Sequence, residues 1–271
     1  MNMFGKKILI NSLPKSGTHL ANKLVEMLGY KFSGASFSSA SLYGRYSIPK
    51  SLLRGAVPGR PTVAVGLDVS AAVRRSWVVK KVSLVSQGQY IGGHVPYTGC
   101  MHKIMSDHGV KIFHVIRDPR DVLISWAHYV PKNSWHYGSA GLAGLSLEHR
   151  VEKILDGYSS RKFYIEPFEN IIKTSQEWLG RESVFAIRFE DLIGPKGGGE
   201  RKAQLSLIDS VGKMCGVENF DTEKLGDDLF GGTKVFRKGQ IGAWSDDISS
   251  DFSSVVNERL ASCVSGLGYE R

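Results

Sequence analysis

The chain alternates between short apolar runs and longer stretches whose apolar residues have helical spacing. Three runs, at residues 8–10, 111–116 and 184–189, are short and mainly apolar, as buried parallel strands are. The first run is followed by a stretch that predicts a helix, with a buried face formed by Leu20, Leu24, Val25 and Leu28. Strands that alternate with helices predict an α/β fold with a parallel central β-sheet flanked by helices.

The rest of the chain adds shorter strands, more helices and two irregular stretches. Short strands are expected at residues 62–66 and 90–92, and helices at 101–107, 119–129, 147–158, 169–179, 200–215 and 251–264. Asp118 is placed to cap the second of these helices, and Pro119 to begin it. Residues 31–62 and 130–146 carry the Ser, Gly and Pro of loops. A loop as long as the first is either a lid over a binding site or a surface insertion, and both interpretations stay open.

Composition limits the class of protein. The 271 residues are 42% hydrophobic and 23% charged, which suffices for a packed core, and we expect a single domain over residues 1–271. The net charge of +9 favours anionic ligands. Basic residues are spread along the chain, and the densest group, at residues 74–75 and 80–81, is expected to be a solvated face. We therefore expect a small anionic ligand and no nucleic acid.

Cysteines and apolar segments bear on the compartment. Cys100, Cys215 and Cys263 are too widely spaced for a metal motif or a disulfide framework, which fits a reducing compartment and predicts no metal site. The N-terminus passes directly into the first strand, which leaves no room for a signal peptide. No apolar run approaches the ~18 residues that span a bilayer. These features predict a cytoplasmic protein without a membrane segment.

Chemistry first enters in the loop after the first strand, where residues 14–18 read Pro-Lys-Ser-Gly-Thr. A strand, a Gly-containing loop and a helix form an anion cradle, because loop amides and the positive end of the helix dipole point at the ligand. Lys15 adds a charge, and Ser16 and Thr18 add hydroxyl donors. Lys15 precedes Gly17, unlike the Lys of a Walker A motif, which weakens the alternative of a P-loop kinase that uses ATP and Mg²⁺. An ordinary strand–helix turn is the other alternative.

Two further segments carry groups that bind anions. Arg117 ends the second strand and Ser125 lies eight residues later, so both can face one phosphate, although Arg-Asp-Pro-Arg-Asp at residues 117–121 also suits a helix-capping network. Residues 236–244 read Phe-Arg-Lys-Gly-Gln-Ile-Gly-Ala-Trp. Adjacent Arg and Lys before Gly, in a segment with too many glycines for a helix, indicate either a loop folded over an anion or a solvated basic turn.

Together and in this order, the three segments resemble the sulfotransferases that use 3′-phosphoadenosine-5′-phosphosulfate (PAPS), of the cytosolic and bacterial type. The resemblance covers residues 6–245, in separate motifs, and implies the sulfotransferase fold with a P-loop-like phosphosulfate-binding loop. It places Lys15, Ser16, Gly17, Thr18 and His19 on the 5′-phosphosulfate. It places Arg117, Ser125, Arg237, Lys238 and Gly239 on the 3′-phosphate, and Phe189 and Phe236 on the adenosine side.

The resemblance also points to a catalytic base. His94, in Gly92-Gly93-His94-Val95-Pro96, matches the family's catalytic His before an apolar residue and Pro. Histidine suits proton transfer near neutral pH, since its ordinary pKa is about 6.5. The implied reaction is an in-line displacement at sulfur, with His94 taking the acceptor proton, Lys15 stabilising the leaving phosphate and 3′-phosphoadenosine-5′-phosphate (PAP) as product.

The chain departs from the family pattern at three positions. Gly92 replaces the Lys of many animal members, Leu20 a Trp that stacks on adenine, and Phe189 a Tyr. The animal dimer motif is absent from the sequence, so we expect a monomer or a weak homodimer. A non-catalytic nucleotide-binding module is a further alternative.

The acceptor is expected to be a small molecule with a hydroxyl or amine. Its pocket is expected to be formed by residues 31–62, the aromatic stretch 126–137 and Tyr97. Asp68, Glu148 and Glu152 are candidates for recognising a cationic acceptor, with a solvated position as the preferred alternative.

Overall fold

A five-stranded parallel sheet forms the centre of the molecule. The computed structural model describes residues 6–43, 59–231 and 238–269. The strand order is β2-β5-β1-β6-β9, with bounds β1 Lys7–Ser12, β2 Lys31–Phe37, β5 Gln89–Gly93, β6 Val110–Ile116 and β9 Val184–Arg188. The three apolar runs are thus confirmed as strands β1, β6 and β9. Ile8, Leu9 and Ile10 are completely buried, because β1 is the central strand and pairs with β5 and β6.

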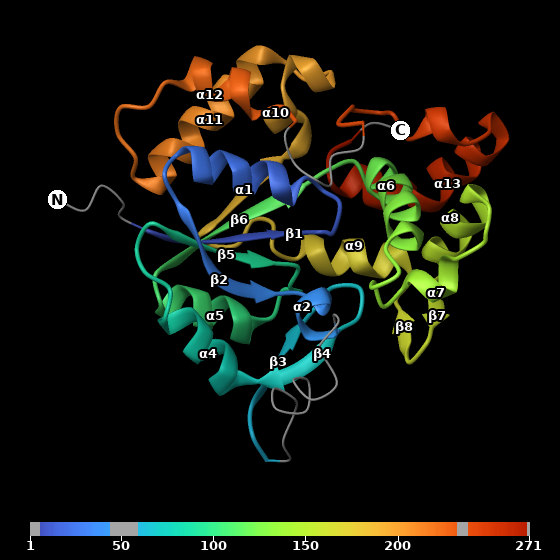
Figure 1. The fold of residues 1–271 in the computed structure, drawn as a ribbon, viewed down its shortest axis with the longest axis horizontal. Coiled ribbons are helices and arrows are strands. Elements are labelled where there is room, and N and C mark those ends of the chain that lie inside the picture. Colours follow the sequence, from blue (N-terminus) through green and yellow to red (C-terminus); the bar gives the residue numbers. More distant parts are fainter. Residues whose placement is uncertain (1–5, 44–58, 232–237, 270–271) are drawn as a thin grey trace.

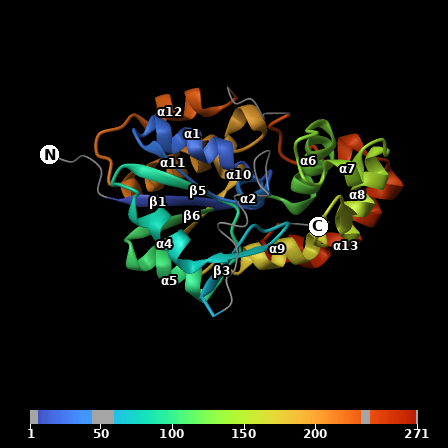
Figure 2. The same ribbon diagram turned by 60° about the horizontal axis from the view of Figure 1, so that its bottom comes forward.

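Helices cover both faces of this sheet (Figures 1 and 2). One face carries α1 (Thr18–Met27), α10 (Phe189–Ile193), α11 (Arg201–Cys215) and α12 (Thr222–Leu229), with the short turn η1 (Pro195–Gly197). The other face carries α4 (Arg75–Ser83), α5 (Gly99–Asp107) and the hairpin of β3 (Thr62–Val65) and β4 (Ala71–Arg74). This arrangement confirms the predicted fold class.

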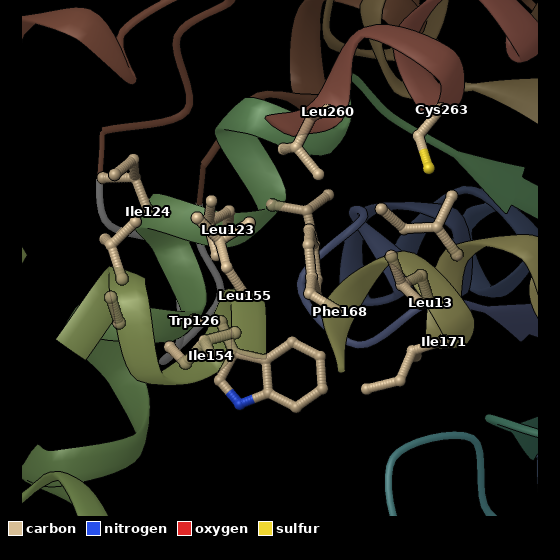
Figure 3. Close-up of a cluster of buried hydrophobic side chains, with 14 of the residues drawn as sticks. Leu13, Leu123, Ile124, Trp126, Ile154, Leu155, Phe168, Ile171, Leu260 and Cys263 are labelled. Carbon is tan, nitrogen blue, oxygen red and sulfur yellow. The ribbon is translucent and has the colours of Figure 1, made fainter. Parts of the chain in front are cut away.

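A third group of helices lies beyond the carboxyl ends of the strands (Figure 1). It contains α6 (Pro119–Lys132), α7 (Ser139–Leu142), α8 (Leu147–Asp156), α9 (Phe168–Gln176) and α13 (Ser250–Gly266), with η2 (Ser245–Asp247) and the hairpin of β7 (Tyr158–Ser160) and β8 (Phe163–Ile165). Its core is a cluster of buried apolar side chains (Figure 3), where the rings of Trp126 and Phe168 meet edge to face with centroids 5.8 Å apart. This packing fixes α6, which carries site residues.

The prediction of a loop over residues 31–62 is wrong for residues 31–43, while the described residues 59–61 are irregular as expected. Residues 31–43 form β2 and the short helix α2 (Ser39–Tyr43), while residues 44–58 lie outside the described part. Strand β2 is an edge strand in which Phe32 is 49% exposed and only Ala35 and Phe37 are buried. Backbone pairing with β5 forms this strand, so its sequence lacks the apolar run of a buried one.

One other difference concerns the end of β9. Phe189 begins α10 and does not end β9. The basic group at residues 74–81 belongs mostly to α4, which presents Val78 and Val82 to the core and leaves Lys80 and Lys81 near its end. Among the helices that the structure describes, none is long and apolar enough to cross a membrane.

Candidate active site

One cavity of about 190 Å³ lies where the segments after β1, β5, β6 and β9 converge. Ten of the predicted site residues line it: Lys15, Gly17, Thr18, His19, His94, Arg117, Ser125, Phe189, Lys238 and Gly239. Ser16 is buried in the loop and does not line the cavity. Phe236 and Arg237 lie outside the described residues. Parallel strands end at the same edge of a sheet, which is why the residues that follow β1, β5, β6 and β9 meet here.

The loop after β1 has the backbone of an anion cradle. Lys15 and Gly17 have positive φ angles of 74° and 100°, and no side chain caps the first turn of α1. The Ser16 hydroxyl is buried without a hydrogen-bond partner among the described residues. The Lys15 ammonium lies 4.0 Å from the centroid of the Tyr129 ring. The loop therefore offers an uncapped helix start and a positive charge at one end of the cavity.

Gly17 is required by its contact with Phe189 as well as by its φ angle. A Cβ at this position would lie 2.5 Å from Phe189 Cδ2. We expect Gly17→Ala to lower the free energy of unfolding by ~1–2 kcal/mol for the left-handed backbone and by a further ~1–3 kcal/mol for the clash. Urea unfolding measures the sum of the two losses.

The control is Gly144→Ala, because Gly144 has a φ of 74° and open space around its Cβ position. That variant should show the backbone cost alone. Equal losses in the two variants would mean that Phe189 moves aside without cost.

His94 is held by a backbone carbonyl. Its Nδ1 lies 2.8 Å from the Ser12 carbonyl oxygen and 3.2 Å from Ser12 Oγ. A carbonyl only accepts, so Nδ1 carries the proton and Nε2 keeps its lone pair. Burial lowers the pKa of His94, and the Ser12 carbonyl and the charge of Asp68 partly oppose that shift. The imidazole is therefore neutral at pH 7, as a base must be.

Asn11 supports the segment that follows His94. Its side-chain amide donates to the Val95 carbonyl (3.2 Å), and its side-chain oxygen accepts from the Val95 amide (2.9 Å). The Asn11 amide nitrogen also lies 3.3 Å from Nδ1 of the buried His114. The two hydrogen bonds between Asn11 and Val95 hold the segment after β5 against β1.

Arg117 directly follows β6, just before α6 begins, and lines the cavity. Its Nη2 lies 3.2 Å from Asp121 Oδ2 and donates to the Gln240 carbonyl at 3.1 Å. The guanidinium carbon lies 4.1 Å from the centroid of the Phe189 ring, and Nε has no hydrogen-bond partner among the described residues. Ser125, one turn beyond Asp121, is buried and also lines the cavity. Arg117 and Ser125 thus present a guanidinium and a hydroxyl to the same cavity.

The capping interpretation of residues 117–121 applies to their other members. The Asp118 side chain accepts from the Arg120 amide (2.8 Å) at the start of α6, as predicted for the N-cap. The Arg120 guanidinium pairs with the same carboxylate (2.6 Å) and donates to Asn257 Oδ1 (2.8 Å). Arg117 alone of the two arginines lines the cavity. The motif thus combines a structural pair with one residue that faces the site.

Lys238 brings a further charge from late in the chain. Its ammonium lies 2.9 Å from Asp247 Oδ1 and 3.5 Å from Asp246 Oδ2. Gly239 follows with a φ of 61°. Two carboxylates share the Lys238 charge, so an anion in the cavity has to compete with them.

The remaining wall of the cavity was only partly predicted. It includes Ser38, Ser39, Ala40, Asp68, Trp126, Tyr129, Val130, Trp135, His136 and Tyr137. Asp68 is 2% exposed, so the preferred solvated position is wrong. Glu148 instead accepts from Ser249, and Tyr97 packs edge to face on Trp178 at 5.2 Å; neither lines the cavity. No local pattern distinguishes Ser39, Asp68 and His136, because tertiary packing brings them together.

Comparison with known proteins places this arrangement in a family. The model of the sulfotransferase domain matches residues 5–195. Cytosolic sulfotransferase 17 of Arabidopsis thaliana is 21% identical over 197 residues, which is 65% of this chain and 55% of that protein. Cytosolic sulfotransferase 15 of the same plant is 24% identical over 191 residues, 62% of this chain and 51% of that protein. The matched region is about half the length of these relatives.

Solved structures share the fold. Mouse sulfotransferase SULT7A1 complexed with PAP superposes with a TM-score of 0.59 and 17% identity, covering 96% of this chain and 85% of that one. Retinol dehydratase in complex with androsterone and inactive cofactor PAP gives 0.57 and 15%, covering 97% and 82%. The family match extends from β1 through α10 and includes the loop at residues 14–18 and Arg117. The resemblance seen in the sequence is thereby confirmed, and the chain belongs to the sulfotransferase domain family.

Proposed function

We propose that this protein transfers a sulfuryl group from PAPS to a hydroxyl or amine of a small-molecule acceptor. One observation carries the proposal: a single cavity is lined by the Lys15 loop, by Arg117 with Ser125, and by His94. The relatives are named cytosolic sulfotransferases and the similar structures contain PAP, which supports this donor and a cytosolic location. We also propose that residues 1–271 act as one domain.

The residues present fit this donor. Arg117 lines the cavity, and its Nε has no partner among the described residues, as expected of a group that binds a ligand. Gly17 keeps the cradle open beside Phe189. Two anion-binding places in one cavity suit a nucleotide with phosphate on both the 3′ and the 5′ position. ATP has no group for the second place, which is why the kinase alternative is weaker.

The donor supplies a sulfuryl group attached to a phosphate leaving group. His94 Nε2, unprotonated because Nδ1 donates to Ser12, accepts the proton of the attacking hydroxyl or amine. The acceptor oxygen or nitrogen bonds to sulfur as the bond between sulfur and the phosphate oxygen breaks, and PAP leaves. Lys15 and the uncapped first turn of α1 stabilise the negative charge that gathers on the departing phosphate.

Calorimetric titration with PAP, adenosine 5′-monophosphate and ATP–Mg²⁺ tests the donor assignment. We expect micromolar binding of PAP and much weaker binding of adenosine 5′-monophosphate, since the latter leaves Arg117 without a phosphate. Preference for ATP–Mg²⁺ would overturn the proposal in favour of a kinase. Tight PAP binding without turnover of PAPS on any acceptor would favour a non-catalytic nucleotide-binding module.

A further inference from the structure

Part of the cavity wall is not formed by the residues assigned to the donor, and this part contains a buried carboxylate. Asp68 lines the same cavity as Lys15, His94 and Arg117 and is 2% exposed. Ser39 Oγ donates to its Oδ1 at 2.5 Å, and the Tyr137 hydroxyl donates to its Oδ2. Both oxygens accept, as those of an ionised carboxylate do.

The surrounding structure holds this carboxylate in place. Gly66 has a φ of 93°, and a Cβ there would lie 2.3 Å from Ser39 Oγ and 2.5 Å from the Val69 carbonyl. The glycine thus lets α2 approach the turn between β3 and β4, where Asp68 lies. Tyr137 packs in turn on His136, with ring centroids 4.3 Å apart. Asp68 is therefore a fixed part of the cavity wall.

The carboxylate has no cationic partner among the residues that the structure describes. None of their ion pairs includes Asp68, and the two side chains that donate to it are hydroxyls. Two histidines feel its charge, but burial lowers the pKa of His94 and of His136. His136 Nδ1 moreover accepts from the Gly138 amide at 3.1 Å, as a neutral imidazole does. A buried carboxylate without a cation is costly and so marks a functional position.

The cavity therefore has two electrostatic ends. Lys15, Arg117 and Lys238 supply positive charge at the end assigned to the donor, and Asp68 supplies negative charge on the acceptor side. A neutral acceptor would leave Asp68 without a cation, and an anionic one would be repelled by it. An ammonium group would pair with Asp68 beside the rings of Trp135, His136 and Tyr137, which line the same wall.

We propose, on the basis of the function proposed above, that the acceptor is a hydroxylated amine whose ammonium binds Asp68 while its hydroxyl is presented to His94. A nitrogen held as ammonium has no lone pair for attack, so the nucleophile is the separate hydroxyl. The O–H proton passes to His94 Nε2, an oxygen–sulfur bond forms, and PAP departs. The product is a sulfate ester that keeps its ammonium.

Matched phenols test this assignment. The probes are tyramine (cationic), 4-ethylphenol (neutral) and 3-(4-hydroxyphenyl)propionate (anionic), with sulfation followed as PAP release and the product identified by NMR. We expect kcat/KM at least tenfold higher for tyramine than for 4-ethylphenol, and no measurable turnover of the propionate. The product from tyramine should carry sulfate on oxygen.

Two variants separate charge from packing. Asp68→Asn keeps the size of the side chain and removes its charge, and should lower the ratio of kcat/KM for tyramine to that for 4-ethylphenol about 50-fold, as expected for a hydrogen bond to a charged group. Ser39→Ala removes one hydrogen bond and keeps the charge, and should keep most of the preference. PAP titration of each variant shows whether it is folded. If Asp68→Asn does not fold, the preference of the wild type for tyramine over 4-ethylphenol still tests the proposal.

The outcomes distinguish the two proposals. Equal kcat/KM for tyramine and 4-ethylphenol, an unchanged ratio in Asp68→Asn, or a sulfamate product would each overturn the assignment of Asp68 while PAP binding and turnover still support a sulfotransferase. Absence of PAP binding would instead overturn the proposed function. Calorimetric titration of tyramine into the PAP-bound protein reports on Asp68 without turnover.

Discussion

Replacing His94 with alanine should lower kcat at least a hundredfold and leave PAP affinity close to that of the wild type. A positioned general base contributes ~10²–10⁴ in rate, and His94 is fixed for this role by its contact with the Ser12 carbonyl. Its ring lines the cavity with Nε2 unprotonated, whereas the charges expected to bind the donor belong to Lys15, Arg117 and Lys238. Steady-state kinetics and PAP titration on the same preparation measure the two effects separately.

His149→Ala is the matched control. His149 is exposed on α8, does not line the cavity, and its side chain bonds Ser146 three residues earlier. This control should turn over at the wild-type rate. Comparable kcat in His94→Ala and His149→Ala would remove His94 from the mechanism.

The pH dependence gives the same test a second readout. The neutral imidazole is the active form, and burial lowers the pKa of His94 below 6.5. Activity should therefore persist as pH falls to 6.5 and decline only below that value, as the ring becomes protonated. The residual activity of His94→Ala should not show this decline. A substitution that only disturbed the structure would lower activity but would leave the decline in place.

The anion cradle could be predicted from sequence because its determinants are local. A buried strand, the Pro-Lys-Ser-Gly-Thr loop and the apolar spacing of α1 are contiguous in residues 7–27. The same holds for Asp118 and Pro119, whose capping geometry needs only α6 itself. Arg117 was found because it directly follows a strand, and parallel strands bring such residues to one edge, whereas His94 was identified through its match to the family motif.

The acceptor wall could not be predicted because no local pattern encodes it. Ser39 reaches Asp68 through the packing of α2 on the turn between β3 and β4. Tyr137 reaches the same carboxylate from an irregular segment 69 positions away. Polar residues in stretches rich in Ser and Gly are most often solvated, so burial of Asp68 follows from tertiary structure alone. Strand β2 escaped detection for a related reason, since backbone pairing at a sheet edge forms it.

Replacing Arg117 with alanine should weaken PAP binding about 100-fold, because truncating one partner of a buried charged hydrogen bond costs ~2–5 kcal/mol. The side chain is 12% exposed, stacks on Phe189 and presents Nε without a partner among the described residues. Calorimetry with PAP and with adenosine 5′-monophosphate separates the contribution of the 3′-phosphate to affinity from that of the 5′-phosphate. The variant should lose affinity for PAP and little for the monophosphate, which has no 3′-phosphate.

Two further variants show whether the fork or the charge matters. Arg117→Lys keeps the positive charge opposite Asp121 and loses the planar fork and its stacking on Phe189, so its PAP affinity should fall between those of wild type and Arg117→Ala. Lys103→Ala removes a charge that is 70% exposed and pairs with Asp107 on α5, and should bind PAP as the wild type does.

Equal losses for PAP and the monophosphate in Arg117→Ala would mean that Arg117 maintains the shape of the cavity through Asp121 and Gln240. A loss confined to PAP would instead mean that Arg117 binds the 3′-phosphate, the group by which this cavity would distinguish its donor from other adenine nucleotides.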